Sequence, residues 1–469
     1  MSIENTHFGA VRIGELLAEC KSIYFIGIGG INMSSLAHLS KKAGYRVGGS
    51  DRTCTELTRR LENSGITVNY SHSEDNAKGY DAFVYTVAIS SDNPEYTYAI
   101  ERGLPCISRA DYLGYIMTRY KDRIGVSGMH GKSTCTSMCA QVLIDGSYSP
   151  TVLSGAELPA MNGAYCVGEG DIFAFEACEY MDSFLDFNPT VAVILNIEMD
   201  HVDYFHSMEQ IRSSFLKYAS LTGKGGYAVY NADDENVRLA LEPYEGNRVS
   251  FGIENGAARF RAVNISEYKG RFEFDVTDRG ELLCRVRLRV SGYHNIYNAL
   301  ATAAACSLCG VSAEHIRQGL ENFCGACRRM EYKGRIKGAE IYDDYGHHPT
   351  EIAATLSGAK KMTAGQLVCV YQPHTYSRTA ALFDDFATAF GHCDKVIFAD
   401  IYAAREINTS GVSTKQLAER IGEKAVWGGD FKRCAELLTD SLKAGDVGIV
   451  MGAGDVYKVF EYLDFEEEK

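Results

Sequence analysis

A glycine-bearing segment between a predicted strand and a predicted helix constrains the fold more than any other part of the chain. It reads Gly128-Met129-His130-Gly131-Lys132-Ser133-Thr134, after the β-rich run Arg123–Ser127 and before Cys135–Ile144, which has the apolar spacing of a helix. Such a turn lets backbone N–H groups converge on phosphate oxygens at the positively polarised start of a helix. Lys132 would add positive charge near the β- and γ-phosphates, and Ser133 a hydroxyl for Mg²⁺. The segment therefore predicts phosphate binding within an α/β domain.

The loop departs from the common form of this motif at one position. Glycine usually stands six residues before the lysine, but Val126 occupies that place, so the loop is a variant. The alternative interpretation is an ordinary glycine turn that carries a solvated Lys132. The strand and the helix on either side favour phosphate binding over this alternative.

Length and composition describe a globular protein of several domains. The 469 residues are too many for one hydrophobic core. The formal charge of −14 argues against nucleic acid or an anionic membrane as a partner. Residues 1–19 lack the form of a signal peptide, and no long uncharged apolar run predicts a membrane span. We therefore expect a cytoplasmic protein without stable membrane insertion.

The 15 cysteines are expected to be mostly reduced thiols in that compartment. Two pairs, Cys306-x-x-Cys309 and Cys324-x-x-Cys327, come close to the spacing of a zinc ribbon. The first pair, however, lies in an apolar run typical of a buried helix, where free cysteine packs as a small apolar residue. We therefore favour the buried helix over a zinc site.

The N-terminal part of the chain has the pattern of a doubly wound α/β domain. Ser22–Gly30 reads as a buried strand that enters a glycine turn, Met33–Lys42 has helical spacing, and Tyr45–Gly49 reads as a second strand. This order predicts a βαβ unit. Asp81–Val87 supplies a further strand, and we expect the first domain to span residues 1–121.

The first glycine turn, Gly27–Ser34, is similar to a dinucleotide-binding fingerprint but incomplete. The third glycine of Gly-x-Gly-x-x-Gly is replaced by Asn32, so NAD binding is disfavoured. Gly29 and Gly30 still predict diphosphate binding, because turn amides and a helix start do not depend on which nucleotide carries the phosphates. Asp51, at the end of the second strand, is placed to meet a ribose hydroxyl.

A second α/β region, expected to span residues 122–324, contains the phosphate loop. Its later strands are predicted at Ile172–Glu176 and Val191–Asn196. The alternating residues and turn signals of Arg259–Val290 predict an antiparallel excursion, which is followed by a helix at Tyr293–Cys309.

A third α/β region is expected to span residues 325–469. Its predicted strands are the short apolar runs Leu367–Tyr371, Lys395–Ala399 and Val447–Met451.

Polar side chains follow the strands of the second region, at the edge where an open parallel sheet binds ligands. Glu176 ends one strand, and Asp200 and His201 follow the next. A carboxylate and an imidazole opposite a phosphate loop can hold a divalent cation. Surface carboxylates with a turn-capping histidine are an equally good interpretation at this point.

Three other polar segments are candidates for ligand contacts. His294-Asn295 precedes a helix, where the two residues could bind a ligand or cap the helix. Asp343–Glu351 combines acids with two histidines, and Gln372–Thr379 follows another strand. No further ligand stands at metal-site spacing, so we favour a substrate-facing loop over a zinc site.

Taken in order, these motifs closely resemble those of the Mur ligases of peptidoglycan synthesis. The resemblance extends over nearly the whole chain, from residue 25 to residue 455. Its most specific marks are Gly128–Thr134, Asn196–His201, His294-Asn295, Arg328-Arg329, Asp343–Glu351, Gln372–Thr379 and Asp400–Glu406.

The resemblance implies an α/β enzyme of three domains. The first is a Rossmann-like domain that binds UDP, with Gly29 and Gly30 at the diphosphate and Asp51 nearby. The second is a central P-loop ATPase-type domain with the antiparallel β excursion, and the third is a Rossmann-like domain that brings the amino acid. A monomer or weak homodimer is expected.

The resemblance also implies roles for individual residues. The loop Gly128–Thr134 would bind ATP together with Mg²⁺, for which Mn²⁺ is expected to substitute. The implied roles are Ser133, Glu176 and His201 as metal ligands, His294 and Asn295 at the adenine, Arg329 at the γ-phosphate, Asp344 at the nucleotide ribose, and Lys132, His348 and Arg378 at the reacting groups.

The implied reaction is an ATP-dependent amide synthesis in peptidoglycan precursor formation. It would join L-alanine to the lactyl carboxylate of UDP-N-acetylmuramate through an acyl phosphate, and release ADP and phosphate. One alternative is a recycling ligase that joins a ready-made tripeptide to the same sugar nucleotide. Another is a nucleotide-binding regulator without catalysis, which the intact Lys132, Ser133, Glu176, His201 and Arg329 disfavour.

Overall fold

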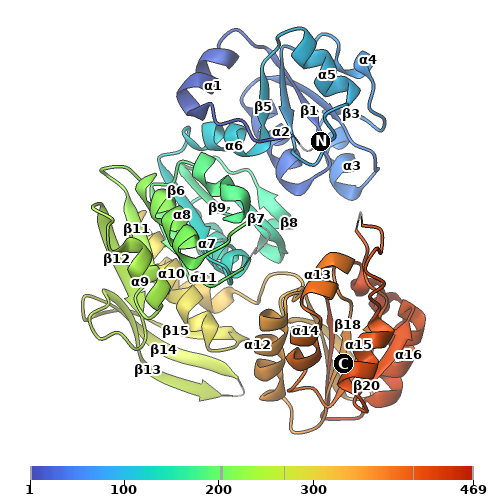
Figure 1. Cartoon of the computed structure of the whole chain (residues 1–469). Coiled ribbons are helices and arrows are strands. Elements are labelled where there is room, and N and C mark those ends of the chain that lie inside the picture. The colour runs from blue at the N-terminus through green and yellow to red at the C-terminus, as the bar shows by residue number, and fades with distance from the viewer. Residues whose placement is uncertain (1–2, 201–203, 269, 405, 467–469) are drawn as a thin grey trace. The chain divides into compact units, whose positions relative to one another are not determined.

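The computed structural model describes residues 3–200, 204–268, 270–404 and 406–466 (Figure 1). These residues form two compact units. The first comprises the chain up to residue 263 with residues 275–286 and 297–322, and the second comprises residues 264–274, 287–296 and the chain from residue 323.

The first sheet is parallel and has the strand order β3-β2-β1-β4-β5. Its strands are β1 (Ser22–Ile26), β2 (Arg46–Ser50), β3 (Thr67–Asn69), β4 (Ala82–Tyr85) and β5 (Cys106–Ser108). The predicted βαβ unit is present as β1, α2 (Ile31–Lys42) and β2. Strand β1 ends earlier than predicted, because Gly27 turns the chain with a φ of 84°.

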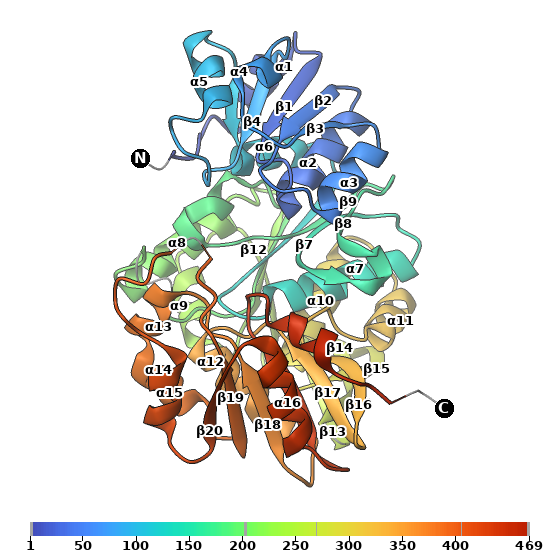
Figure 2. The same ribbon diagram turned by 90° about the vertical axis from the view of Figure 1, so that its right-hand side faces the viewer.

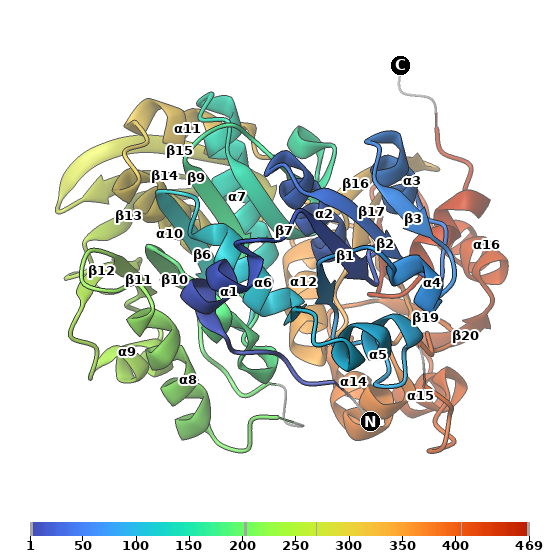
Figure 3. The same cartoon turned by 90° about the horizontal axis from the view of Figure 1, so that it is seen from above.

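Helices cover both faces of this sheet, as Figure 3 shows. One face packs on α1 (Gly9–Leu17), α2 and α6 (Arg109–Met117), and the other on α4 (Glu74–Ala77) and α5 (Pro94–Glu101). The two faces follow the alternation of the strand: Phe25 lies in the first core and Tyr24 in the second. Helix α3 (Glu56–Asn63) links β2 to β3.

The second sheet has ten strands in the order β15-β14-β13-β12-β11-β10-β6-β9-β7-β8. They are β6 (Asp122–Ser127), β7 (Thr151–Leu158), β8 (Gly163–Cys166), β9 (Ile172–Glu176), β10 (Val191–Ile194), β11 (Tyr227–Asn231), β12 (Asn247–Gly252), β13 (Phe260–Tyr268), β14 (Arg271–Asp278) and β15 (Glu281–Ser291). Its helices are α7 (Lys132–Asp145), α8 (Met208–Ser220), α9 (Glu235–Leu241), α10 (His294–Leu308) and α11 (Ala313–Asn322), with 3-10 turns at Pro159–Met161 and Tyr180–Asp186.

The predicted excursion at 259–290 extends this second sheet. Strands β13, β14 and β15 follow one another through short turns, and β13 pairs in parallel with β12. The strand predicted at Ile172–Glu176 is β9 with the same bounds, and Cys306 is buried within α10, in the helix expected for it.

The third sheet has the order β16-β17-β21-β18-β19-β20. Its strands are β16 (Glu331–Ile336), β17 (Ala339–Asp344), β18 (Leu367–Tyr371), β19 (Lys395–Ala399), β20 (Ala425–Gly429) and β21 (Val447–Met451). Only β16 runs antiparallel to its neighbour β17 among the pairings of this sheet. The predicted strands Leu367–Tyr371, Lys395–Ala399 and Val447–Met451 are confirmed residue for residue.

The third sheet also has helices on both faces (Figure 2). They are α12 (Pro349–Lys360), α13 (Tyr376–Ala381), α14 (Phe383–Ala389), α15 (Thr414–Ile421) and α16 (Phe431–Ser441), followed by the 3-10 turn Val456–Tyr462. Cys369 of β18 packs in the core with α12, α14 and α15, and its neighbours Val368 and Val370 pack in the core with α16.

The predicted α/β fold class is confirmed by these three helix-flanked sheets. The domain boundaries at residues 121/122 and 324/325 remain predictions. Among the described residues, no helix combines the length and the apolar character that a membrane crossing requires.

Candidate phosphate-binding and catalytic site

The loop Gly128–Thr134 joins β6 to α7, as predicted. Gly128 and Gly131 have φ values of 137° and 83°, a backbone conformation that side chains disfavour. A Cβ on Gly131 would lie 2.8 Å from Oδ1 of Asn298, so space as well as backbone requires glycine there. Gly131 is the N-cap of α7, and the unpaired first amides of this helix are therefore available to an anion.

Asn196, just beyond β10, holds the middle of this loop. Its Oδ1 accepts the backbone N–H of His130 at 2.8 Å, and its Nδ2 donates to the carbonyl of His130 at 3.0 Å. The N–H of Met129 donates to the backbone carbonyl of Asn196 at 3.3 Å. The loop is thus shaped by fixed protein contacts.

Lys132 lies between its own loop and a buried carboxylate. Its Nζ donates to the carbonyls of Gly128 at 2.6 Å and Met129 at 3.3 Å, and lies 3.1 Å from the carboxylate of Glu179. Burial alone would lower the pKa of Lys132, but the charges of Glu179 and Glu176 outweigh it and the pKa is raised. Lys132 therefore stays a cation at the start of α7.

Ser133 and Glu176 form the oxygen-rich part of the site. The hydroxyl of Ser133 donates to Oε2 of Glu176 at 2.7 Å, and the N–H of Gly155 donates to the same oxygen at 2.9 Å. Neighbouring ligands of an octahedral Mg²⁺ lie about 2.9 Å apart, given metal–oxygen distances of about 2.0–2.1 Å. The Ser133 and Glu176 oxygens therefore fit adjacent positions around such an ion.

The remaining predicted metal ligand, His201, lies outside the described residues. Within the described part of the chain, no group of three His, Cys, Asp or Glu side chains is arranged to hold a metal ion. A Mg²⁺ bound to Ser133 and Glu176 would complete its coordination with phosphate oxygens and water, as Mg²⁺ commonly does, and with His201 if the predicted role holds.

The second unit brings other predicted residues to one edge of the third sheet. Asp344 ends β17, and its carboxylate accepts the N–H groups of Met330 and Gly346 at 2.9 and 2.8 Å. Burial raises the pKa of Asp344, and the charge of Arg329 partly opposes this. Asp344 therefore orders the segment that carries Arg329.

His348 is the N-cap of α12. Its Nδ1 accepts the N–H of Thr350 at 3.4 Å, and Glu351 completes a capping box by accepting the N–H of His348. Burial lowers the pKa of the neighbouring His347 to about 4, so this ring is neutral at physiological pH. Nδ1 of His348 therefore caps the helix, and the predicted contact with the substrate would involve Nε2.

Arg378 lies on α13, beyond β18, in the second predicted segment of this edge. Its Nη1 donates to the carbonyl of His374 at 3.5 Å, and the ring of His374 lies 6.2 Å from that of His347. The segments Asp343–Glu351 and Gln372–Thr379 thus adjoin in space, at the edge where the parallel strands β17 and β18, which flank β21, both end.

His294 and Asn295 form the start of α10. The side-chain amide of Asn295 donates to the carbonyl of Ser291 at 2.7 Å. Burial, together with the charge of Arg329, lowers the pKa of His294. Asn295 therefore ties the helix start to the preceding strand, while the predicted adenine contacts of His294 and Asn295 stay predictions.

In the first domain, Asp51 holds the glycine turn. Its Oδ2 accepts the N–H of Gly29 at 2.9 Å, and a Cβ on Gly29 would lie 2.8 Å from the same oxygen. Gly30 is the N-cap of α2. The predicted diphosphate turn is thus closed onto Asp51, which orders the turn in addition to any contact with ribose.

Sequence reasoning missed three residues of these sites. They are Glu179, Asn298 and Glu95, whose polar side chains are buried. Glu179 contacts Lys132, 47 residues away, and Glu95 contacts Tyr24, 71 residues away. The available signal for Glu179 was an acid three residues after Glu176, close to a strand end.

Comparisons with known proteins cover most of the chain. Three family models match: "Mur ligase family, catalytic domain" over residues 22–121, "Mur ligase middle domain" over 126–306, and "Mur ligase, glutamate ligase domain" over 328–454.

The curated relatives include two UDP-N-acetylmuramate–L-alanine ligases. That of Acetivibrio thermocellus is 44% identical over 445 residues, which cover 94% of this chain and 95% of the relative. That of Caldanaerobacter subterraneus subsp. tengcongensis is 43% identical over 457 residues, 97% of this chain and 99% of the relative. The solved structure of a UDP-N-acetylmuramate–alanine ligase from Thermotoga maritima matches with a TM-score of 0.77 at 29% identity, over 94% of this chain and 98% of that one.

Proposed function

Because this chain belongs to the Mur ligase family, we infer that it is an ATP-dependent ligase that joins L-alanine to the lactyl carboxylate of UDP-N-acetylmuramate. The observation that carries this conclusion is the full-length match to ligases of that name at 43–44% identity. The arrangement of Lys132, Ser133 and Glu176 around the phosphate loop supports it chemically.

The reaction must first activate a carboxylate, because oxide is a poor leaving group. A lactyl carboxylate oxygen attacks the γ-phosphorus of ATP, the bond to the β-phosphate oxygen breaks, and ADP leaves. The product is an acyl phosphate, in which the carbonyl carbon now bears phosphate as its leaving group. The amine of L-alanine attacks this carbon, and the tetrahedral intermediate expels phosphate to leave the amide.

Cationic groups must offset the repulsion between the carboxylate and the phosphates. We assign this role to Lys132 at the phosphate loop and to Arg329 at the γ-phosphate. The N–H groups at the start of α7 would add partial positive charge. A Mg²⁺ held by Ser133, Glu176 and His201 would supply further charge neutralisation at the phosphate oxygens.

The ammonium group of L-alanine must lose one proton to become a nucleophilic amine, and the nitrogen loses a second proton to the surrounding water as the amide forms. Nδ1 of His348 accepts the N–H of Thr350, so a proton taken from the amine, directly or through water, would go to Nε2. We assign Arg378 to the reacting carboxylate, Asp344 to the nucleotide ribose, and His294 and Asn295 to the adenine. Gly29, Gly30 and Asp51 would hold the UDP part of the substrate. We further propose a cytoplasmic enzyme that is a monomer or weak homodimer.

Phosphate release from ATP and Mg²⁺ with UDP-N-acetylmuramate tests this function. L-alanine and the tripeptide of the recycling reaction are supplied in parallel. Release that requires L-alanine is the expected result. Release that requires the tripeptide would assign the protein to cell-wall recycling, and silence with both acceptors despite ATP binding would leave a nucleotide-binding regulator.

A further inference from the structure

Glu95 is a buried carboxylate to which the proposed reaction assigns no role. It lies in the first turn of α5, where the side chain of Asn93 caps the helix and accepts the N–H of Glu95 at 3.0 Å. The exposed fraction of Glu95 is 0%. A carboxylate is costly to bury unless hydrogen bonds replace its water, so its partners reveal what it is for.

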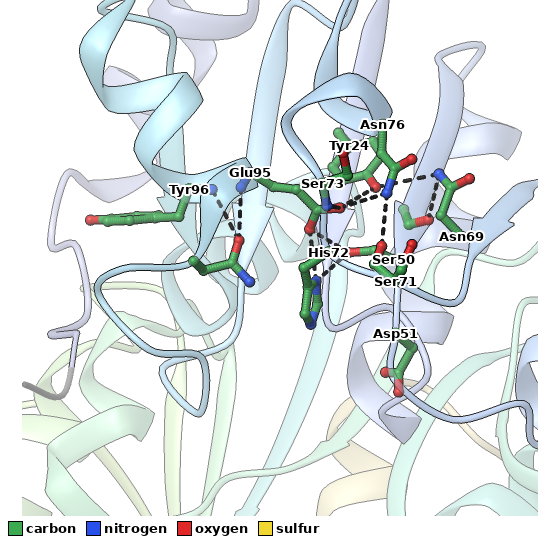
Figure 4. A network of polar contacts seen from close by, with 12 residues as sticks. Tyr24, Ser50, Asp51, Asn69, Ser71, His72, Ser73, Asn76, Glu95 and Tyr96 are labelled. Carbon is green, nitrogen blue, oxygen red and sulfur yellow. Dashed lines mark hydrogen bonds and ion pairs between the residues drawn. The ribbon is translucent and has the colours of Figure 1, made fainter.

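Five donors from separate parts of the first domain meet on this one carboxylate (Figure 4). Its Oε1 accepts the hydroxyl of Tyr24 at 2.9 Å, Nδ2 of Asn76 at 3.2 Å and the N–H of Ser73 at 3.4 Å, and its Oε2 accepts the hydroxyl of Ser50 at 2.5 Å and Nδ1 of His72 at 2.9 Å. Glu95 therefore ties the middle of β1 and the end of β2 to α4 and to the segment that precedes it.

One of these donors connects Glu95 to the predicted diphosphate turn. The backbone carbonyl of Ser50 accepts the N–H groups of Gly27 and Ile28 at 2.8 and 2.9 Å. The next residue, Asp51, holds the N–H of Gly29. The side chain of Ser50 is thus fixed by Glu95, while its backbone sets the position of the glycine turn.

A second donor, His72, stands at the boundary between this network and solvent. Nδ1 of its ring faces both Glu95 and the hydroxyl of Ser50, at 2.9 and 3.0 Å, and 13% of the side chain is exposed. A hydrogen bond from the ring to a carboxylate oxygen requires a hydrogen on Nδ1, and this contact fixes the orientation of the ring. In Figure 4 the ring of His72 extends from the network toward the side on which Asp51 lies.

We propose that Glu95 is a positioning residue for the uridine diphosphate part of the substrate. It acts through Ser50 on the glycine turn and through Nδ1 of His72, which presents Nε2 to the nucleotide. Metal sites use the same arrangement: a carboxylate binds one ring nitrogen of a histidine and so orients the other ring nitrogen toward the ligand. This inference rests on the proposed function only in taking UDP as the nucleotide.

The test compares two matched glutamate variants on the same helix. Glu95→Gln keeps the size of the side chain but turns an amide N–H₂ toward donors, so hydrogen bonds to Ser50 or His72 are lost. Glu101→Gln, at an exposed position of α5, is the control. Calorimetry with UDP alone and with ATP alone measures the two sites separately. We expect Glu95→Gln to weaken UDP binding by about 10-fold, with ATP binding unchanged and Glu101→Gln like the wild type.

His72→Gln keeps the test decisive if Glu95→Gln does not fold. It should also weaken UDP binding and leave ATP binding unchanged. Each single variant should lower the affinity for UDP by some factor. The double variant should lower it by less than the product of those two factors, because both changes act on the ring of His72. Unchanged UDP binding in both single variants would overturn the proposal. So would equal losses for UDP and ATP, or single losses that simply multiply in the double variant.

UDP binding also separates this inference from the proposed reaction. A wild-type protein that binds UDP but releases no phosphate with either acceptor would reject the ligase activity and leave the role of Glu95 testable as described. A wild-type protein that does not bind UDP would overturn the inference about Glu95.

Discussion

Replacing Lys132 by methionine should destabilise the protein as well as inactivate it. The Nζ of Lys132 lies 3.1 Å from the carboxylate of Glu179, whose exposed fraction is 0%. Lys132→Met would leave that carboxylate without its lysine, and breaking a buried ion pair from one side costs about 3–5 kcal/mol. At about 2–4 °C per kcal/mol for a unit of this size, the first thermal transition should fall by roughly 6–20 °C.

A double-mutant cycle followed by scanning calorimetry isolates the effect of the pair. Glu179→Gln alone should lower the stability less than Lys132→Met. In that variant Lys132 still donates hydrogen bonds to the carbonyls of Gly128 and Met129, and 13% of its side chain is exposed to water. The double variant Lys132→Met/Glu179→Gln should regain most of the lost stability, since it buries no unpaired charge. Phosphate release should stay absent in both variants that lack Lys132, which separates catalysis from stability.

Two results would refute this reasoning. One is a Lys132→Met protein that unfolds at the wild-type temperature. The other is a double variant no more stable than Lys132→Met, because the loss would then come from the loop contacts of the lysine rather than from the isolated carboxylate.

Three further changes test the central and third domains. Gly131→Ala should weaken ATP binding about 10-fold or more by calorimetry, because a left-handed φ costs an alanine about 1–2 kcal/mol and its Cβ would meet Asn298 at 2.8 Å; Gly225→Ala, with nothing within 4 Å, should have no effect. Glu176→Gln should remove the gain in ATP affinity that Mg²⁺ confers, again about 10-fold or more, and an undiminished gain would reject Glu176 as a metal ligand. Burial raises the pKa of Asp343 to about 6, so the folded state holds a proton that the unfolded state releases, and this contribution to stability is lost as pH rises from about 4 to 6. Asp343→Asn should flatten that decline, by at most about 3 kcal/mol, in thermal unfolding across this pH range.

The elements that sequence predicted best are those decided by local physics. Strands β9, β18, β19 and β21 are short apolar runs with polar or turn residues at both ends, and a buried parallel strand needs no more than that. The phosphate loop was equally predictable, because Gly128 and Gly131 adopt positive φ values that the sequence already favoured.

Buried polar contacts could not be predicted in the same way. The hydroxyl of Tyr24 meets Glu95 across 71 residues of sequence, and Lys132 meets Glu179 across 47. Nothing in the local pattern states which distant donor a buried carboxylate will find. The same limit applies to the extension of the second sheet by β13, which depends on its pairing with β12 rather than on its own alternation.

Polar residues at helix starts posed a different difficulty, since capping and ligand binding require the same atoms. His348 was predicted at the substrate, and the structure gives its Nδ1 the N-cap of α12. Asn295 was open to both interpretations, and its side chain bonds the carbonyl of Ser291. A single sequence does not distinguish a cap from a ligand contact, because both follow from the unpaired groups of a helix terminus.

The backbone around Arg329, the proposed γ-phosphate contact, is strained in the folded protein. Arg328 and Met330, on either side of it, have φ values of 57° and 50°, a left-handed conformation that costs each residue about 1–2 kcal/mol. The carboxylate of Asp344 and the carbonyls of Gly452 and Gly454 hold the segment in this conformation. The unfavourable conformational energy of the residues on either side of Arg329 is therefore offset by contacts that form when the domain folds. If Arg329 contacts the γ-phosphate as proposed, ATP binding would not have to supply the free energy that orders this segment.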